Sequence, residues 1–165
     1  MNVLFHLVAG FGIAIAVCTE VAKPKIFLTA TAGVFIAFVS HALLDYTPHC
    51  YPINSKVDFI AGFILLFALI FFARKEYKVI MLVTLTGAVL PDIIDLLPAI
   101  LNKQLHLKLP VYNKVFPWHW KNYSGSIYNG NCSTSHLNTA MICFATGIIM
   151  LVRWNTIKTI YALRR

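Results

Sequence analysis

Charged residues are scarce in this chain of 165 residues. Asp, Glu, Lys and Arg make up 12% of it, hydrophobic residues make up 59%, and the mean hydropathy is +0.73. A soluble domain of this size needs more polar surface, so the composition indicates an integral membrane protein. The sequence contains neither internal repeats nor low-complexity segments, and its length suits a single domain over residues 1–165.

Acidic residues are especially few, since six Asp and Glu stand against 14 Lys and Arg and give a formal net charge of +8. In a soluble protein this excess would favour nucleic acid as a partner. The sequence shows neither a basic stripe interleaved with aromatic residues nor a nucleic-acid-binding motif. Most basic residues lie in short segments between apolar runs, as is usual in membrane proteins. We therefore expect the lipid bilayer as a partner and no nucleic acid, and leave the oligomeric state open.

Five apolar runs are long enough to cross a bilayer as helices, because about 20 residues span its hydrocarbon core. The expected fold is an all-α bundle of five transmembrane helices. The expected spans are residues 3–19, 26–44, 57–73, 79–101 and 136–152, with a long loop at 102–135 and a basic tail at 153–165. The first run has no basic segment before it, so we expect it to remain as a span and not to be cleaved as a signal peptide.

Five spans place the termini on opposite sides of the membrane, and the basic residues then divide unevenly. Nine accompany the C-terminus, namely Lys23, Lys25, Arg74, Lys75, Lys78, Arg153, Lys158, Arg164 and Arg165. Five lie on the other face, namely Lys56, Lys103, Lys108, Lys114 and Lys121. Because cytoplasmic loops carry the excess of Lys and Arg, we expect a cytoplasmic C-terminus in a cell inner or plasma membrane.

Histidines and aspartates gather at the N-terminal, extracytoplasmic face of the expected bundle. They are His6 in the first span, His41 and Asp45 in the second, Asp58 in the third, Asp92 and Asp95 in the fourth, and His136 in the fifth. Small residues share their helical faces, so these side chains are expected to point into the bundle. A charge within the hydrocarbon costs roughly 2.5–3.5 kcal/mol, so such carboxylates need partners. Imidazole and carboxylate are ligands of zinc and related divalent metals, which predicts a metal site near this membrane face.

The expected metal ligands are His6, His41, Asp45, Asp92 and His136, which hold one or more divalent ions, most simply zinc. The expected catalytic residues are Asp92, Asp95 and His119, with His49 and Asp58 as accessory residues. Pro91 removes a backbone donor and is expected to kink or break the fourth span.

Simpler interpretations exist for several of these residues. The His41–Asp45 pair also fits a hydrogen bond at a helix end, and Asp58 fits a favourable charge at the start of its own helix. The aromatic residues around His119 also fit anchoring at the membrane interface.

Two of the four cysteines fall in loops of the same face. They are Cys50 and Cys132, whereas Cys18 and Cys143 fall within spans and are expected in the core. An extracytoplasmic face permits a Cys50–Cys132 disulfide that ties the long loop to the site. Two free thiols are the alternative.

Three segments resemble the membrane-bound metal-dependent hydrolases, relatives of the zinc-dependent phospholipase C and P1-type nuclease group. The segments are Phe5-His6-Leu7, Ser40-His41-Ala42-Leu43-Leu44-Asp45 with Pro48-His49, and Gly87-Ala88-Val89-Leu90-Pro91-Asp92. The soluble relatives place the Pro-Asp segment before the His-x-x-x-Asp segment, whereas here it follows. The resemblance implies that His41, Asp45 and His6 are metal ligands and that Asp92 is a ligand or general base.

A bound cation lowers the pKa of its water to about 7 and polarises a phosphoryl oxygen, while a second carboxylate accepts the proton. A site at the bilayer surface implies a substrate delivered from the lipid. We therefore expect a membrane-embedded metal-dependent hydrolase of a phospholipid or another lipid-linked phosphate, with ester or amide substrates next. A transporter of protons or divalent cations, or a non-catalytic metal-stabilised scaffold, would use a similar cluster.

Overall fold

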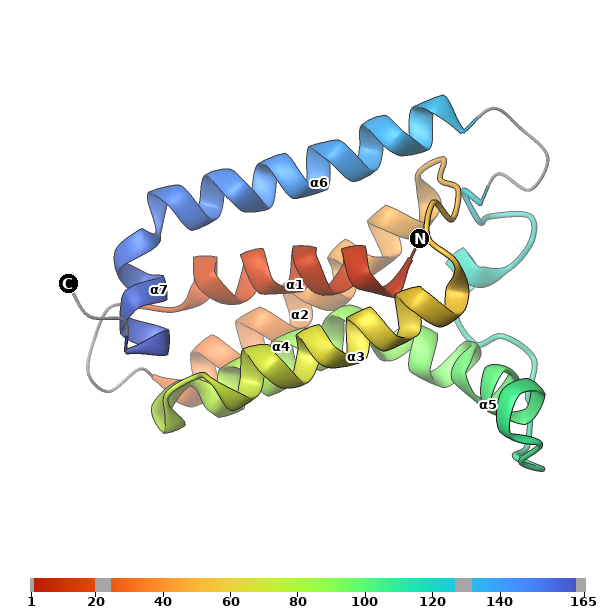
Figure 1. Cartoon of the computed structure of the whole chain (residues 1–165), viewed down its shortest axis with the longest axis horizontal. Coiled ribbons are helices and arrows are strands. Elements are labelled where there is room, and N and C mark those ends of the chain that lie inside the picture. Colours follow the sequence, from red (N-terminus) through yellow and green to blue (C-terminus); the bar gives the residue numbers. More distant parts are fainter. Residues whose placement is uncertain (1, 20–24, 127–131, 163–165) are drawn as a thin grey trace.

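A computed structural model describes residues 2–19, 25–126 and 132–162, and its secondary structure there is helical (Figure 1). The long helices are α1 (Val3–Val17), α2 (Ile26–Tyr46), α3 (Ser55–Phe71), α4 (Lys75–Asp95) and α6 (Ser133–Val152). The short ones are α5 (Leu97–Leu105), the 3-10 helix η1 (Pro117–His119) and α7 (Trp154–Tyr161). Figure 1 shows the five long helices side by side and alternating in direction, which makes an up-and-down bundle.

Three helices are long and apolar enough to cross a membrane, namely Ile26–Tyr46, Lys75–Asp95 and the Thr134–Val152 part of α6. With 15 residues in α1 and 17 in α3, their lengths are about 22 and 26 Å at 1.5 Å per residue, less than the roughly 30 Å of hydrocarbon. By length and composition, the structure thus shows three candidate spans, fewer than the five expected.

The centre of the bundle is formed by α1 and α4. α1 packs against α2, α3, α4 and α6, and α4 also packs against α2 and α3. Apolar side chains of both central helices, such as Leu7, Met81 and Leu85, are fully buried. Large apolar side chains such as Phe63 and Phe144 are exposed on the outer helices, as expected of a surface that faces lipid.

Two glycines let α2 and α4 approach closely. A Cβ at Gly33 would overlap Thr84 Oγ1, and a Cβ at Gly87 would lie 2.7 Å from Val34 Cγ2 and 3.0 Å from the Val34 carbonyl oxygen. Small residues allow this kind of backbone approach between membrane helices. The contact fixes α2 against α4 near the middle of both helices, below the ends that carry His41, Asp45 and Asp92.

The structure corrects the expected fourth helix at residues 79–101. α4 begins at Lys75, continues through Pro91 without a break and ends at Asp95, and the separate helix α5 follows. Pro98 lies in the first turn of α5, where the missing N–H is harmless, and this explains why the new helix starts there. The expected tail also differs, because α7 buries Thr156, Ile157 and Ile160.

Candidate metal centre

Four buried side chains meet where α2, α4 and η1 come together. They are His41 and Asp45 of α2, Asp92 of α4 and His119 of η1, and one ligand atom from each lies within 4.8 Å of the others. The spacing of four residues puts His41 and Asp45 on one face of α2. This metal group can hold a metal ion.

The separations between the ligand atoms fit a tetrahedral ion. His119 Nε2 lies 3.0 Å from Asp45 Oδ2 and 3.3 Å from Asp92 Oδ1. His41 Nε2 lies 3.2 Å from Asp45 Oδ2, 3.5 Å from His119 Nε2 and 3.8 Å from Asp92 Oδ1. Nitrogen and oxygen ligands of zinc at 2.0–2.2 Å are about 3.4 Å apart in a tetrahedron. The side chains therefore need little movement to surround such an ion.

In the neutral form of each histidine, a hydrogen bond behind the ring holds the proton on Nδ1 and leaves Nε2 without one. His41 Nδ1 donates to the Ala88 carbonyl oxygen at 2.7 Å, and His119 Nδ1 donates to Asp95 Oδ2 at 2.8 Å. A neutral imidazole carries a single proton, so each Nε2 presents a lone pair. Two lone pairs and two carboxylate oxygens thus face one another, and a cation would satisfy all four. Such bonds behind ligating histidines are usual in metal sites.

In the metal-free protein, a proton on His119 meets part of this excess of acceptors. Burial by itself lowers the pKa of His119, but hydrogen bonds to Asp45, Asp92 and Asp95 outweigh it and raise the pKa to about 9. A metal ion and this proton compete for the same lone pair.

Asp95, expected as a catalytic residue, holds the loop and His119 in place. Its Oδ1 accepts a hydrogen bond from the Val115 N–H at 2.8 Å, and its Oδ2 accepts from the Phe116 N–H at 3.0 Å and from His119. Both oxygens are therefore engaged by the loop, and Asp95 contacts the metal group through His119.

His6, expected as a ligand, lies behind Asp45 and outside the metal group. Its Nε2 is 3.1 Å from Asp45 Oδ1, and its ring stacks on that of His41 with centroids 3.9 Å apart. By donating to Oδ1, His6 leaves Asp45 Oδ2 for the centre of the group. His6 Nδ1 is buried and has no hydrogen-bond partner among the described residues.

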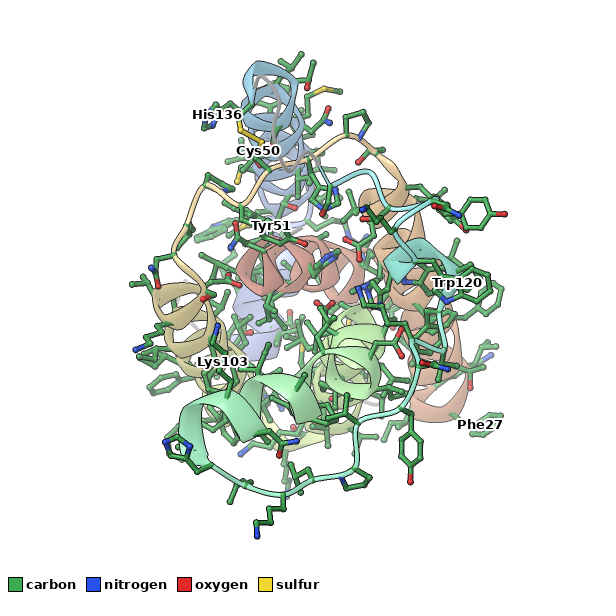
Figure 2. The ribbon with its side chains drawn as sticks, turned by 90° about the vertical axis from the view of Figure 1, so that its right-hand side faces the viewer. Phe27, Cys50, Tyr51, Lys103, Trp120 and His136 are labelled. Carbon is green, nitrogen blue, oxygen red and sulfur yellow. A yellow bond between two sulfur atoms is a disulfide. The ribbon has the colours of Figure 1, made fainter. Side chains whose placement is uncertain are left out.

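Two further expected residues lie elsewhere. His136 is exposed at the start of α6 and does not join the metal group (Figure 2). The neighbouring Ser135, about 100° away around the helix, is the buried residue and contacts Cys50. Asp58 accepts hydrogen bonds from the Val3 and Leu4 N–H groups at 2.9 Å each, so its carboxylate caps α1 and not its own helix.

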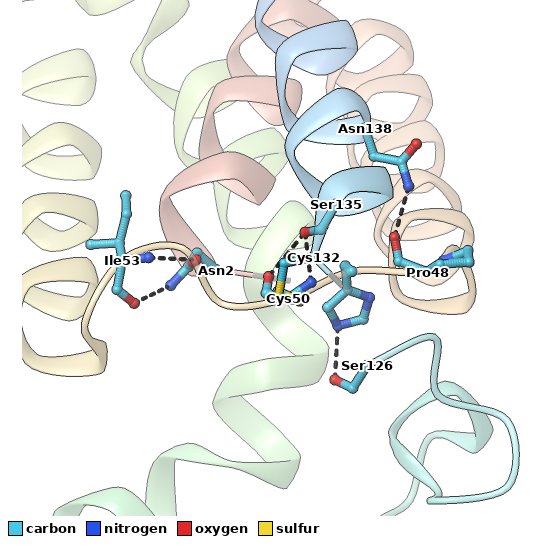
Figure 3. The surroundings of a disulfide bond; sticks show 9 residues. Asn2, Pro48, Cys50, Ile53, Ser126, Cys132, Ser135 and Asn138 are labelled. Carbon is cyan, nitrogen blue, oxygen red and sulfur yellow. Dashed lines mark hydrogen bonds between the residues drawn. A yellow bond between two sulfur atoms is a disulfide. The ribbon is translucent and has the colours of Figure 1, made fainter. Parts of the chain in front are cut away.

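A disulfide joins Cys50 to Cys132 at this end of the bundle (Figure 3). The Ser135 hydroxyl accepts a hydrogen bond from the Cys50 N–H at 2.6 Å, and Asn138 donates to the Pro48 carbonyl oxygen at 2.7 Å. These contacts tie the loop after α2 to the start of α6. Cys18 is a buried free thiol, whereas Cys143, expected in the core, is exposed on α6.

Aromatic side chains lie beside the metal group, and sequence reasoning did not assign them to it. The ring of Trp118 packs against those of Phe38, Tyr46 and Phe116, and its centroid is 6.5 Å from that of His41. Trp118 Nε1 is buried and has no hydrogen-bond partner among the described residues. Phe38 comes about one helical turn before His41, and that spacing is a signal that could have indicated its position.

Comparison of the chain with protein-family models, curated proteins and solved structures finds no match. A functional assignment therefore depends on the geometry of the side chains.

Proposed function

We propose that this chain is a membrane-embedded, metal-dependent hydrolase that cleaves a phosphoester in a phospholipid or another lipid-linked phosphate. The convergence of two imidazole lone pairs and two carboxylates at the metal group carries this proposal. That ligand set suits zinc, and the same residues carry the resemblance to membrane-bound metal-dependent hydrolases. A zinc ion would supply Lewis-acid activation of water and of a phosphoryl oxygen.

Asp92 is placed to accept a proton. Its Oδ1 faces the two histidines of the metal group, and its Oδ2 is buried without a hydrogen-bond partner among the described residues. A carboxylate with one unengaged oxygen can take the proton of an attacking water. His6 and Asp95 hold Asp45 and His119 in place, so the arrangement exists before substrate binds.

The aromatic cluster of Phe38, Tyr46, Phe116 and Trp118 supports a lipid substrate. Tyr46 is 46% exposed, and Trp118 contacts both Tyr46 and the ligand histidines. The cluster thus connects the bundle surface with the metal group. Aromatic rings at a membrane interface suit a molecule with a polar head and apolar chains. The buried Trp118 N–H is a donor that a phosphate oxygen would satisfy.

We also infer that α1 and α3 cross the membrane with the three longer helices. α2 and α4 both run toward the metal group, so α3 between them has to return over the same distance (Figure 1). α1 likewise runs from that end to the opposite end. Short spans are accommodated by local thinning of the bilayer.

We infer that the metal group faces the extracytoplasmic side. The Cys50–Cys132 disulfide lies at this end, and disulfides persist in oxidising compartments. Arg74, Lys75 and Arg153 lie toward the other end, in agreement with a cytoplasmic location. Lys23, Arg164 and Arg165 of the same basic set lie outside the described residues.

Metal analysis of the purified protein tests the proposal. We expect about one zinc per chain in the wild type, and loss of zinc in His41→Ala and Asp92→Asn. His136→Ala is the matched control, because this exposed histidine lies outside the metal group, and it should retain zinc. Unchanged zinc in both ligand variants would refute the assignment of those ligands.

A screen of phospholipids and lipid-linked phosphates in mixed micelles then tests the reaction. We expect zinc-dependent release of a phosphate-containing product or of inorganic phosphate, lost with EDTA and restored with zinc. Retained zinc with cation flux in liposomes and no hydrolysis would instead support a transporter. The clustering of the metal group at one end of the bundle argues for the hydrolase, because a transport pathway needs polar residues through the full thickness.

A further inference from the structure

A second pair of reactive side chains joins the loop after α2 to the long loop before α6. Ser126 Oγ is 3.0 Å from His49 Nε2 (Figure 3). An isolated parallel bridge also pairs the backbones of the same two residues. His49, expected as an accessory residue of the metal site, does not belong to the four-residue metal group. The pair is therefore a separate constellation with chemistry of its own.

The direction of its hydrogen bonds follows from the partners. His49 Nδ1 lies 2.8 Å from the Thr47 carbonyl oxygen, which only accepts, so Nδ1 carries the ring proton. Nε2 is then a lone pair, and Ser126 donates its hydroxyl proton to it. Burial lowers the pKa of His49, which keeps the imidazole neutral and able to accept that proton. Ser126 as nucleophile, His49 as base and the Thr47 carbonyl as the acceptor that orients the base form the arrangement of an activated serine.

Tyr51 is a second polar partner of the Ser126 hydroxyl. Its hydroxyl lies 3.1 Å from Ser126 Oγ, and because the proton of Ser126 is directed at His49, Tyr51 is the donor of this bond. Such a donor stabilises the serine oxygen as its proton leaves. Tyr51 is 53% exposed and Ser126 is half-buried, so an ester group can reach the serine from outside.

Backbone contacts hold the pair in this geometry. The His49 N–H donates to the Gly125 carbonyl oxygen at 2.8 Å, and the Gly125 N–H donates to the Asp45 carbonyl oxygen at 2.8 Å. A Cβ at residue 125 would overlap the Thr47 carbonyl, so this close approach requires glycine. The adjacent Cys50–Cys132 disulfide further restrains the loop. A nucleophile and its base that are fixed before substrate binds are what catalysis requires.

We propose that Ser126 is a nucleophile, and His49 its general base, for acyl transfer from a carboxylic ester. Ser126 Oγ bonds to the ester carbonyl carbon while its proton moves to His49 Nε2. The bond from carbonyl carbon to alcohol oxygen then breaks, and the alcohol leaves with that proton. Water next gives a proton to His49 and attacks the acyl-serine, which releases the carboxylic acid and restores Ser126. The Thr47 carbonyl takes the place of the carboxylate in a Ser-His-Asp triad.

An alkyl fluorophosphonate, which bonds covalently to activated serines, tests this proposal. The full-length protein is labelled in detergent with its metal present and again after EDTA, and the adduct is located by peptide mass spectrometry. We expect labelling of Ser126 in both states, no such adduct in Ser126→Ala, and labelling at least about 100-fold slower in His49→Gln. Ser40→Ala is the matched control, because that hydroxyl bonds to its own helix at Ala37, and it should label at the wild-type rate.

The outcomes are separable from those of the metal-dependent reaction. Labelling of Ser126 no faster than of other serines, or at the same rate in His49→Gln, would overturn the proposal. If His49→Gln loses its helical circular dichroism, a burst assay on the wild type and Ser126→Ala tests the proposal instead. The wild type should release p-nitrophenol from p-nitrophenyl butyrate in a burst equal to the protein concentration. A burst that persists in Ser126→Ala would contradict the assignment of Ser126 as the nucleophile. Because labelling continues in EDTA, loss of zinc and loss of the serine reaction are independent results.

Discussion

The side chain of His119 is the member of the metal group that does not come from a long helix. It reaches the two carboxylates from η1, and Asp95 at the end of α4 holds its ring. Burial lowers the pKa of His119, but its hydrogen bonds to three aspartates outweigh burial and raise the pKa from its ordinary value of 6.5 to about 9 in the metal-free protein. Proton and metal therefore compete at this nitrogen over a pH range that experiments reach easily.

The metal-free protein is expected to lose stability as the pH rises from 6.5 through 9. The folded-state pKa of His119 lies above the unfolded one, so protonation stabilises the fold fully below pH 6.5, and this contribution is lost as the pH passes about 9. Stabilisation by zinc should increase over the same interval, because the competing proton leaves. Thermal unfolding between pH 6 and 9.5, with zinc and with EDTA, measures both effects.

His119→Asn is the control for this pH dependence, because it removes the titrating group and should flatten both curves. A metal-free wild type that gains stability between pH 7 and 9 would contradict the assignment of the proton to His119.

The roles of single side chains were predictable from the sequence only in part. The spacing of His41 and Asp45 indicated one helical face, and the structure places both in the metal group with Asp92. The sequence could not distinguish His6 from the metal ligands, because the distance of His6 from the metal group depends on how α1 packs against α2. His136 illustrates the same limit, since one residue of helical rotation exposes it and buries Ser135.

The packing of α2 against α4 determines whether the metal group can form. α2 provides His41 and Asp45, α4 provides Asp92, and both helices approach each other at Gly33 and Gly87. A side chain that forces these helices apart would therefore separate the ligands as well as loosen the core.

Gly87→Ala is expected to destabilise the protein by roughly 1–3 kcal/mol, the usual cost of overpacking, and to weaken zinc binding. A Cβ there would lie 2.7 Å from Val34 Cγ2 and 3.0 Å from the Val34 carbonyl oxygen, and the backbone cannot yield without moving α2. Gly147→Ala on α6 is the matched control, because no atom lies within 4 Å of a Cβ at that position. It should be neutral or stabilising by up to about 1 kcal/mol, since alanine favours helix.

Thermal unfolding and chelator competition on both glycine variants give the two readouts. Equal zinc affinity in Gly87→Ala and Gly147→Ala would show that the close approach of α2 and α4 does not position the ligands.

The helices themselves were predicted well by apolar runs, and their ends were predicted less well. The expected span at 26–44 corresponds to Ile26–Tyr46, because its apolar residues and its terminal polar residues coincide with the helix. The expected span at 79–101 divides at Leu96, because a proline at residue 98 suits the start of a helix better than its interior. The sequence of residues 106–126 shows no periodicity, so the position of η1 against α2 could not be predicted and became known only from the structure.

The whole bundle has two chemically different ends. The metal group, the Ser126–His49 pair and the disulfide all lie at the end where α2 and α4 finish. At the other end, the Arg74 N–H donates to the Ile160 carbonyl oxygen, and Arg153 contacts the Cys18 carbonyl oxygen. The one-sided distribution of histidines and aspartates was visible in the sequence because alternating spans assign each residue to a face.

The orientation of these two ends can be measured through the disulfide. If the metal group faces the extracytoplasmic side, an impermeant reductant followed by an impermeant maleimide should label both Cys50 and Cys132 in intact expressing cells. The Cys50→Ser, Cys132→Ser double variant removes that signal and corrects for other thiols. Lys158→Cys in that double variant supplies a thiol on α7 at the opposite end, and it should react only after the cells are permeabilised. Labelling of Lys158→Cys in intact cells, with Cys50 and Cys132 protected, would reverse the orientation and leave the disulfide in a reducing compartment, where such bonds are rare.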